Sequence, residues 1–349
     1  MINIGIIGVG RISTRHINEL SAVKDARITA ICDVDTEKLK AVGDKLNLPE
    51  NRRFTDYHDL IACDDVDAVE ICTPNYLHVP MAIDVLRAGK PVEVEKPLST
   101  CYEHGVEELL SLVDETNLTN MICFSYRFMP AVRYAKHLIE SGELGKIVNV
   151  NVEYLQSGTF IPGRKLEWRF VKEYAGSGTL GDLGVHLIDM TRFLIDDFAS
   201  VYGISNIIVP ERQRLDSDEY AKVDTDDLTA FVAKLKNGVI ANFLVTKCAV
   251  GESNTIKYEL FGTNGIIRFN LNEPHMITIA RAASNKTDAI VETVEVPKEF
   301  VLGQEECFVK ALHGEFREHF PTAKEGAICQ RIVDAILLSA EKNCVVTLD

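Results

Sequence analysis

Several features that would indicate other classes of protein are missing from this sequence. It holds a single tryptophan, Trp168, in 349 residues. No apolar run approaches the roughly 20 residues that cross a membrane. The nine cysteines show no C-x-x-C spacing, which argues against a zinc site. Acidic residues outnumber basic ones by 52 to 37, and there is no basic tract, so nucleic acid is not an expected partner.

The cysteines and the start of the chain both favour a reducing compartment. Cys32, Cys72 and Cys123 lie within apolar runs typical of buried strands. We therefore expect packed, reduced thiols rather than disulfides. The chain runs directly into a strand, without a basic region, apolar stretch and cleavage site. These features predict a cytoplasmic protein that has no membrane segment.

A length of 349 residues favours two domains. The first, residues 1–123, alternates short apolar segments with helical ones, as expected for parallel strands covered on both faces. This rhythm predicts an α/β domain with a doubly wound parallel sheet. The expected strands are Ile2–Ile7, Arg27–Cys32, Ala68–Cys72, Pro91–Glu95 and Asn120–Phe124, and the expected helices are Ile12–Ala22, Thr36–Lys45, Val79–Ala88, Glu103–Glu115 and Met129–Ser141.

The second domain, residues 124–349, has a different pattern. Its strand-like segments follow one another with turn signals between them, as at Lys236-Asn237-Gly238 and at Gly262-Thr263-Asn264-Gly265. This pattern predicts an α+β domain on an open, largely antiparallel sheet. The expected strands are Ile147–Leu155, Ser200–Val209, Leu228–Leu235, Val239–Cys248, Ile256–Phe261, Ile266–Asn270, Met276–Ala280 and Ile290–Val296, and the expected helices are Gly178–Ile195, Gln304–Glu318 and Gly326–Glu341.

A glycine-rich turn follows the first strand, in the segment Gly8-Val9-Gly10-Arg11-Ile12-Ser13. The first glycine permits a tight turn, and the second lets the backbone approach a pyrophosphate at the start of the next helix. Ser13 replaces the usual third glycine, but it is still small enough for close helix–strand packing. An ordinary strand-to-helix turn is the alternative. The context of strand, helix and a later acidic residue favours a dinucleotide site.

That acidic residue is Asp33, at the end of the second strand. Its carboxylate can accept hydrogen bonds from both hydroxyls of the adenosine ribose, and its charge would repel a 2′-phosphate. The sequence therefore predicts NAD as the cofactor, with NADP less favoured. Lys38 is close enough in sequence to weaken this preference. The alternative for Asp33 is a capping or turn role, as is also expected of Asp35.

Two further strands end in polar segments, Thr73-Pro74-Asn75 and Glu95-Lys96-Pro97. Ligands of open parallel sheets bind beyond the carboxyl ends of the strands. Lys96 is therefore a candidate functional residue, and an ion pair with Glu95 at the domain edge is the alternative.

A polar stripe interrupts the apolar helix expected over Gly178–Ile195. Asp182, His186 and Asp189 stand at i, i+4 and i+7, and so share one face of an α-helix. Buried polar groups need partners, and a pocket wall would supply them. The alternatives are a satisfied buried network or a solvent-facing side. A metal site is disfavoured because no H-E-x-x-H motif or cysteine partner accompanies the stripe.

These motifs together resemble the Gfo/Idh/MocA oxidoreductases, the glucose–fructose oxidoreductase and inositol dehydrogenase family, over nearly the whole chain. The resemblance is carried by the glycine turn, Asp33, Thr73-Pro74-Asn75 with His78, Glu95-Lys96-Pro97, Tyr126-Arg127-Phe128 and the run Gly178-x-x-x-Asp182-x-Gly184-x-His186-x-x-Asp189. Gly176-Ser177-Gly178 departs from the three glycines that are common in the family, but no reacting group is lost.

The resemblance implies a Rossmann domain followed by a substrate domain, and it implies that Lys96, Asp182 and His186 meet at the nicotinamide. We favour His186 as the proton acceptor, Lys96 as the group that polarises the reacting oxygen, and Asp182 as the holder of a substrate hydroxyl; the roles of Lys96 and His186 are exchangeable. The expected cofactor-binding residues are Gly8, Gly10, Arg11, Ile12, Asp33, Thr73, Asn75, His78, Glu95 and Lys96.

Tyr126, Arg127, Arg164, Lys165 and Trp168 are expected to bound the rest of the substrate, with ordinary surface or interface packing as the alternative. The expected activity is NAD-dependent oxidation of a secondary alcohol of a cyclic polyol, inositol or sugar. Reduction of a ketosugar or nucleotide sugar, a non-catalytic NAD-binding regulator and a hydrolase that uses NAD transiently are the alternatives. The family also implies a homodimer or homotetramer formed through the C-terminal sheet.

Overall fold

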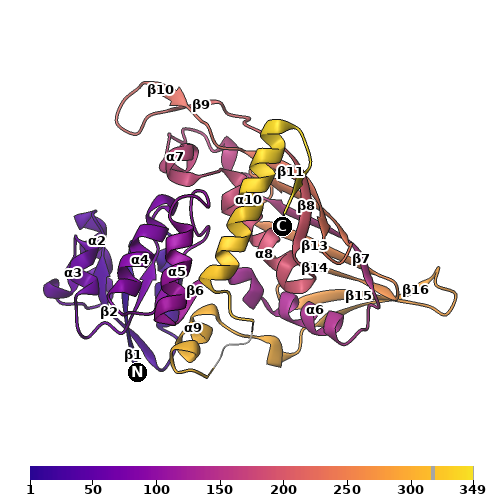
Figure 1. The fold of residues 1–349 in the computed structure, drawn as a ribbon, viewed down its shortest axis with the longest axis horizontal. Coiled ribbons are helices and arrows are strands. Elements are labelled where there is room, and N and C mark those ends of the chain that lie inside the picture. Colours follow the sequence, from indigo (N-terminus) through magenta and orange to yellow (C-terminus); the bar gives the residue numbers. More distant parts are fainter. Residues whose placement is uncertain (316–318, 349) are drawn as a thin grey trace. The chain divides into compact units, whose positions relative to one another are not determined.

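The structure is a computed structural model that describes residues 1–315 and 319–348, and the chain forms two compact units (Figure 1). Unit 1 consists of Met1–Phe124 and Gly303–Ile328, and unit 2 consists of Ser125–Leu302 and Cys329–Asp349. The sequence predicts a single boundary after residue 123, whereas a later segment returns to unit 1. This segment forms hydrogen bonds with strand β6 (Asn120–Ile122): the Pro321 carbonyl accepts from the Ile122 N–H at 2.7 Å, and the Asn120 side chain accepts from the Ala323 N–H at 2.8 Å.

Unit 1 is built on a six-stranded sheet in the order β3-β2-β1-β4-β5-β6, in which every pairing is parallel. This strand order is that of a Rossmann sheet, which confirms the predicted α/β fold. The strands are β1 (Ile2–Ile7), β2 (Ala26–Cys32), β3 (Arg53–Phe54), β4 (Ala68–Ile71), β5 (Val92–Val94) and β6 (Asn120–Ile122).

Five helices of unit 1 connect these strands: α1 (Ser13–Leu20), α2 (Thr36–Lys45), α3 (Tyr57–Ile61), α4 (His78–Arg87) and α5 (Val106–Thr116). The returning segment adds α9 (Gln304–Leu312). The predicted last helix was to run to Glu318, and its end lies outside the described residues. Because all strands are parallel, the turns after β1, β2, β4 and β5 lie at one edge of the sheet, where ligands of such folds bind.

Unit 2 is built on a nine-stranded sheet in the order β16-β15-β14-β13-β7-β12-β11-β8-β17. Neighbouring strands are antiparallel except β7 and β12, which confirms the predicted, largely antiparallel sheet. The strands are β7 (Ile147–Leu155), β8 (Phe198–Asn206), β11 (Leu228–Leu235), β12 (Ile240–Thr246), β13 (Thr255–Gly262), β14 (Gly265–Asn270), β15 (Met276–Ala282), β16 (Ala289–Glu295) and β17 (Val346–Thr347).

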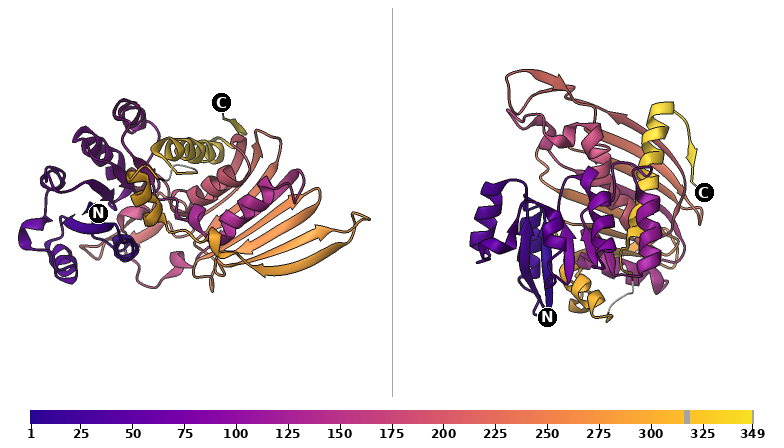
Figure 2. Two further views of the ribbon diagram at one scale, coloured as in Figure 1. Left: turned by 90° about the horizontal axis from the view of Figure 1, so that it is seen from below. Right: turned by 60° about the vertical axis from the view of Figure 1, so that its left-hand side comes forward.

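Helices lie on one face of this sheet, as Figure 2 shows. They are α6 (Pro130–Glu140), α8 (Val185–Leu194) and the main part of α10 (Ala323–Lys342), which starts in unit 1. The short helix α7 (Lys172–Ala175) also belongs to unit 2. Helices α6 and α8 pack on each other. The expected strand Ser200–Val209 ends at Asn206, and a separate hairpin of β9 (Glu211–Gln213) and β10 (Tyr220–Lys222), which the sequence did not predict, follows it.

All nine cysteines lie in the described part of the chain, and none forms a disulfide. Among residues 1–315 and 319–348, none of the helices combines the length and the apolar character that crossing a membrane requires.

Candidate active site

The glycine turn joins β1 to α1 in unit 1. Gly8 has a φ of +90°, and a Cβ on it would lie 2.8 Å from the carbonyl oxygen of Cys72, so the position requires glycine. Around Gly10, no described heavy atom lies within 4 Å of the position of a Cβ. Ser13 is buried, and its hydroxyl donates to the Gly10 carbonyl at 2.8 Å. This turn leaves room for a pyrophosphate at the start of α1, so the residues fit a dinucleotide.

Asp33 ends β2 beside this turn. Its carboxylate accepts from the N–H of Val9 at 2.8 Å and from the N–H of Asp35 at 2.9 Å. Asp33 thereby joins the glycine turn to the second strand and still has lone pairs for ribose hydroxyls. Lys38 pairs with Asp35 at 2.7 Å, so the cation closest in sequence is held by another carboxylate. Asp35 is also the N-cap of α2, as expected.

The segments after β4 and β5 are held together by His78. Its Nδ1 lies 2.8 Å from the Pro97 carbonyl oxygen, and its Nε2 lies 2.9 Å from the Thr73 carbonyl oxygen. Burial lowers the pKa of His78, so the neutral ring donates to one of the two carbonyls. The Thr73 hydroxyl is buried and has no hydrogen-bond partner in the described part. These contacts favour a positioning role for His78; its contact with the cofactor stays a prediction, as does that of the buried Asn75.

The pKa of the Glu95 carboxylate is shifted far from its ordinary value. Burial alone would raise its pKa, but the hydrogen bond and charge of His16 outweigh burial and lower the pKa to about 2. The Nε2 of His16 lies 3.0 Å from Glu95 Oε1, and Glu95 Oε2 accepts from the backbone N–H of Lys96 at 3.1 Å. Lys96 is half-buried at the carboxyl end of β5 and precedes a cis peptide bond to Pro97.

In unit 2, Asp182 forms an ion pair with a lysine that the sequence interpretation missed. Lys247, just after β12, places its Nζ 2.6 Å from Asp182 Oδ2, and its side chain is 13% exposed. His186 is buried on α8, and its ring packs edge-on against Tyr126 with 4.6 Å between centroids. A carboxylate, an ammonium and an imidazole thus come from neighbouring elements. Only long-range strand pairing brings Lys247 here, and no local motif marks it.

Hydroxyl and amide groups extend this set. The Tyr126 hydroxyl lies 2.7 Å from that of Tyr154, and the Asn254 side chain contacts both hydroxyls, at 3.1 and 2.8 Å. Tyr126 was predicted, whereas Tyr154 and Asn254 read as ordinary strand and loop residues in the sequence. Such groups suit recognition of a ligand rich in hydroxyls, because each hydroxyl both donates and accepts hydrogen bonds.

The helix that carries Asp182 and His186 differs from its prediction. Leu180–Gly184 is a π-helical turn, and α8 begins only at Val185. The expectation of a single α-helix over Gly178–Ile195, with its three-residue polar stripe, is therefore wrong over this turn, because its wider repeat changes the positions of the side chains. Asp226 binds the start of the turn by accepting from the N–H groups of Gly178 at 2.7 Å and Leu180 at 2.9 Å.

The third residue of the expected stripe, Asp189, pairs with Arg127. The Arg127 Nη2 lies 2.6 Å from Asp189 Oδ1, and the Nε lies 2.8 Å from Oδ2, with both side chains at most 5% exposed. A satisfied buried pair was the alternative for Asp189, and the geometry supports it. For Arg127, a structural role is favoured, and a contact with substrate stays a prediction.

Arg164, Lys165 and Trp168 lie together in the segment before α7. The Arg164 guanidinium donates to the Gly158 carbonyl at 3.0 Å. Its Cζ lies over the Phe170 ring, 4.7 Å from the ring centroid. Lys165 Nζ lies 3.5 Å from the Leu215 carbonyl oxygen, and all three residues are half-buried. Packing accounts for Arg164, and the three substrate-binding assignments stay predictions.

The parallel sheet and the glycine turn with Asp33 define an NAD-binding oxidoreductase fold. The description "Oxidoreductase family, NAD-binding Rossmann fold" matches residues 2–124, and "GFO/IDH/MocA C-terminal domain" matches residues 132–268. The chain belongs to the Gfo/Idh/MocA oxidoreductase family, which confirms the resemblance noted from its motifs. It is an NAD-dependent enzyme.

Named relatives support this membership. The chain is 32% identical to levoglucosan dehydrogenase of Pseudarthrobacter phenanthrenivorans over 300 residues. The aligned region covers 81% of this chain and 77% of the relative. The chain is 29% identical to myo-inositol 2-dehydrogenase of Thermotoga maritima, over 76% of this chain and 74% of the relative. A solved structure of levoglucosan dehydrogenase in complex with NADH is similar with a TM-score of 0.92, at 29% identity, and covers 100% of this chain and 99% of that one.

Proposed function

We propose that this enzyme transfers hydride between NAD and a secondary alcohol of a cyclic polyol, an inositol or a sugar. The observation that carries the proposal is the set of neighbouring polar groups in unit 2: the Asp182–Lys247 ion pair, the His186 ring and the Tyr126 hydroxyl. These groups include both hydrogen-bond acceptors and hydrogen-bond donors, and such a mixture complements a ligand with several hydroxyls. Two relatives are named for levoglucosan and myo-inositol, which are cyclic molecules with several hydroxyl groups.

Oxidation of a secondary alcohol removes a hydride from carbon and a proton from oxygen. The glycine turn and Asp33 would hold NAD, which would supply the hydride acceptor. His186 takes the hydroxyl proton, and Lys96 polarises and positions the reacting oxygen; the exchanged assignment is the alternative. Asp182 accepts a hydrogen bond from a second substrate hydroxyl, and Lys247 fixes the orientation of the Asp182 carboxylate through the ion pair.

A spectrophotometric screen tests this proposal. Purified protein is incubated with NAD or NADP and with inositols, aldoses, anhydrosugars and sugar acids, and NADH formation is followed. We expect turnover of at least one compound with NAD. Lys96→Ala should abolish turnover and keep NAD binding, whereas Lys45→Ala, at an exposed lysine of α2, should behave as the wild type. NAD binding without turnover across the panel would instead support a regulator, and full activity of Lys96→Ala would remove Lys96 from the mechanism.

We also propose that the protein is a cytoplasmic homodimer or homotetramer that associates through the sheet of unit 2. Apolar side chains on neighbouring strands support this, since Val232 is 45% exposed and Ile240 is 44% exposed. Covering such residues stabilises an assembly. Light scattering on a sizing column should give a mass of two or four chains, and Val232→Glu should shift the protein towards the monomer. A monomeric wild type would refute the proposal.

A further inference from the structure

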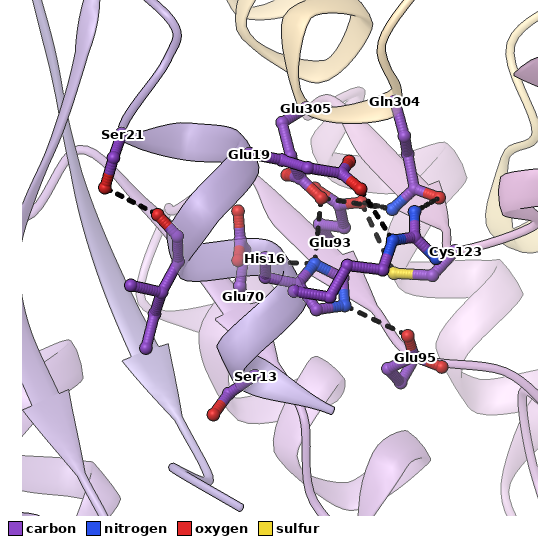
Figure 3. Close-up of polar contacts among 12 residues, drawn as sticks. Ser13, His16, Glu19, Ser21, Glu70, Glu93, Glu95, Cys123, Gln304 and Glu305 are labelled. Atoms are coloured by element: carbon purple, nitrogen blue, oxygen red, sulfur yellow. Dashed lines mark hydrogen bonds and ion pairs between the residues drawn. The ribbon is translucent and has the colours of Figure 1, made fainter. Parts of the chain in front are cut away.

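A cluster of polar, mostly titratable side chains is buried in unit 1, and it includes Glu95, the neighbour of Lys96 described above. Its centre is His16, on α1 (Figure 3). Every member is at most 6% exposed, and the cluster consists of His16, Glu70, Cys72, Glu93, Glu95, Cys123, Gln304 and Glu305. So many ionisable groups away from water are costly unless their charges and protons are matched.

His16 lies between two carboxylates. Its Nδ1 is 2.8 Å from Glu305 Oε1, and its Nε2 is 3.0 Å from Glu95 Oε1. Ionised carboxylates only accept, so a ring that donates to both is an imidazolium. Burial alone would lower the pKa of His16, but the contacts with Cys72 and Glu305 oppose burial and raise it well above its ordinary range. His16 is therefore a buried cation with one counterion on each side.

The remaining carboxyls of the cluster hold protons. Burial, together with the neighbouring Glu305 carboxylate, raises the pKa values of Glu70 and Glu93 well above their ordinary range. Both Glu70 oxygens and one Glu93 oxygen are buried without a hydrogen-bond partner among the described residues, and these two side chains lie within 4.8 Å of Glu305. The other Glu93 oxygen accepts from Gln304 at 2.7 Å and from Cys123 at 3.3 Å. Glu95 and Glu305 are thus the ionised members.

The cluster is connected to the turn that carries Lys96. Glu95 binds His16 through one carboxylate oxygen and the backbone N–H of Lys96 through the other. His16 itself belongs to α1, the helix that starts directly after the glycine turn. The His16 side chain therefore connects two turns. Its helix follows the turn after β1, and its ring binds Glu95 in the turn after β5.

We propose that His16, hydrogen-bonded through both ring nitrogens to Glu95 and Glu305, is a positioning residue that holds the Glu95–Lys96–Pro97 turn and so places Lys96 for the reaction. This inference rests on the proposed function of Lys96. Residue Glu305 comes from α9, so the returning segment Gly303–Ile328 supplies the second counterion and is part of the positioning device.

A metal ion is the main competing account, because ligand atoms of His16, Glu93 and Cys123 lie within 4.8 Å of one another. The proton positions inferred above disfavour it. Ring nitrogens that each donate a proton have no lone pair for a metal. Burial also raises the pKa of Cys123 well above its ordinary range, with the Glu93 carboxyl adding to the effect, so that residue is a thiol rather than a thiolate ligand.

The first measurement uses wild-type protein without ligands. Histidine labelled with ¹⁵N distinguishes imidazolium from neutral rings by nuclear magnetic resonance, and the resonance absent from His16→Gln identifies His16. We expect this ring to remain protonated at a pH well above the ordinary value of 6.5. Glu70 Oε2 lies 3.7 Å from His16 Nδ1. Arg15, Cys72 and Cys123 also face the cluster, and the contact with Cys72 adds to the rise in the pKa of His16. A His16 that titrates near 6.5 would overturn the proposal.

The second measurement compares His16→Gln with Glu70→Gln. Glutamine at position 16 keeps hydrogen-bonding capacity but cannot hold both carboxylates as a cation, so Lys96 shifts and kcat should fall about 10²-fold with a much smaller change in KM. Glu70 is already protonated, so the amide is a close mimic, and both kcat and KM should match the wild type. Wild-type kcat in His16→Gln would overturn the proposal, as would a stoichiometric metal that only the wild type retains.

A third readout separates this inference from the proposed function. Competitive acetylation, followed by peptide mass spectrometry, reports the reactivity of Lys96 whether or not a substrate is known. We expect His16→Gln to change the reactivity of Lys96 several-fold and Glu70→Gln to leave it as in the wild type. If no compound is turned over but these results hold, the proposed function fails and the positioning role stands. If turnover occurs and Lys96 reactivity is unchanged in His16→Gln, the positioning role fails alone.

Discussion

Replacing Arg127 with leucine should destabilise unit 2 strongly, because it removes the guanidinium that pairs with the buried Asp189 carboxylate. Asp189 is 1% exposed, and Arg127 forms a bidentate pair with it. Breaking such a pair on one side costs about 3–5 kcal/mol, whereas removing both charges together is close to neutral. For a unit of this size, that cost lowers the melting temperature by roughly 6–20 °C.

Differential scanning calorimetry and urea unfolding of four proteins measure this effect. They are the wild type, Arg127→Leu, Asp189→Asn and the double variant, which together form a thermodynamic cycle. We expect both single variants to be destabilised and the double variant to recover most of the lost free energy. The control is Arg87→Leu, at an exposed ion pair with Glu108, which should cost under about 1 kcal/mol.

One pattern of results would refute this reasoning. If Arg127→Leu unfolded at the wild-type temperature and yet raised KM for a sugar in the screen, its guanidinium would contact substrate rather than support unit 2. Equal destabilisation in the double and single variants would likewise show that the pair is not the source of the effect.

Two further predictions concern unit 1. Asp33→Ser should weaken NAD binding about 10- to 100-fold and reduce the discrimination against NADP in fluorescence titrations, whereas Lys38→Ala should change neither, since Lys38 is paired with Asp35. Glu95→Gln should be less stable than the wild type above pH 4.5, because the folded-state pKa of Glu95, about 2, lies below its ordinary value of 4.5. This difference should vanish as pH falls from 4.5 to 2 in urea unfolding experiments; a constant difference would contradict it.

Most of unit 1 could be predicted from sequence, because the signals of its strands and turns are local; the short elements β3 and α3 were missed. Strands covered on both faces are continuous apolar runs, and the glycine turn and Asp33 follow directly on two of them. The His16 cluster could not be predicted. Its members come from α1, β4, β5, α9 and the residues directly after β4, β5 and β6. A buried histidine has the same sequence signal as one at a surface.

Unit 2 was predicted less completely for the same physical reason. Period-two alternation locates strands such as β11 and β12, but it does not tell which strands pair, so Lys247 beside Asp182 was missed. The π-helical turn before α8 was missed because its sequence has the apolar spacing of an α-helix. Its start depends on Asp226, which approaches Gly178 so closely that a Cβ there would collide with the Asp226 carbonyl oxygen.

The return of Gly303–Ile328 to unit 1 makes the chain pass between the two units three times, after residues 124, 302 and 328. The Rossmann unit is therefore not a segment that can be cut out as one piece. A fragment that ends at residue 124 loses Glu305 and the Pro321 carbonyl. It therefore removes one of the two carboxylates that bind His16 and the hydrogen-bond acceptor of the Ile122 N–H in β6. Recombination between relatives could exchange this unit only by replacing both of its segments, Met1–Phe124 and Gly303–Ile328, together. The cofactor unit is therefore expected to be inherited with the rest of the chain.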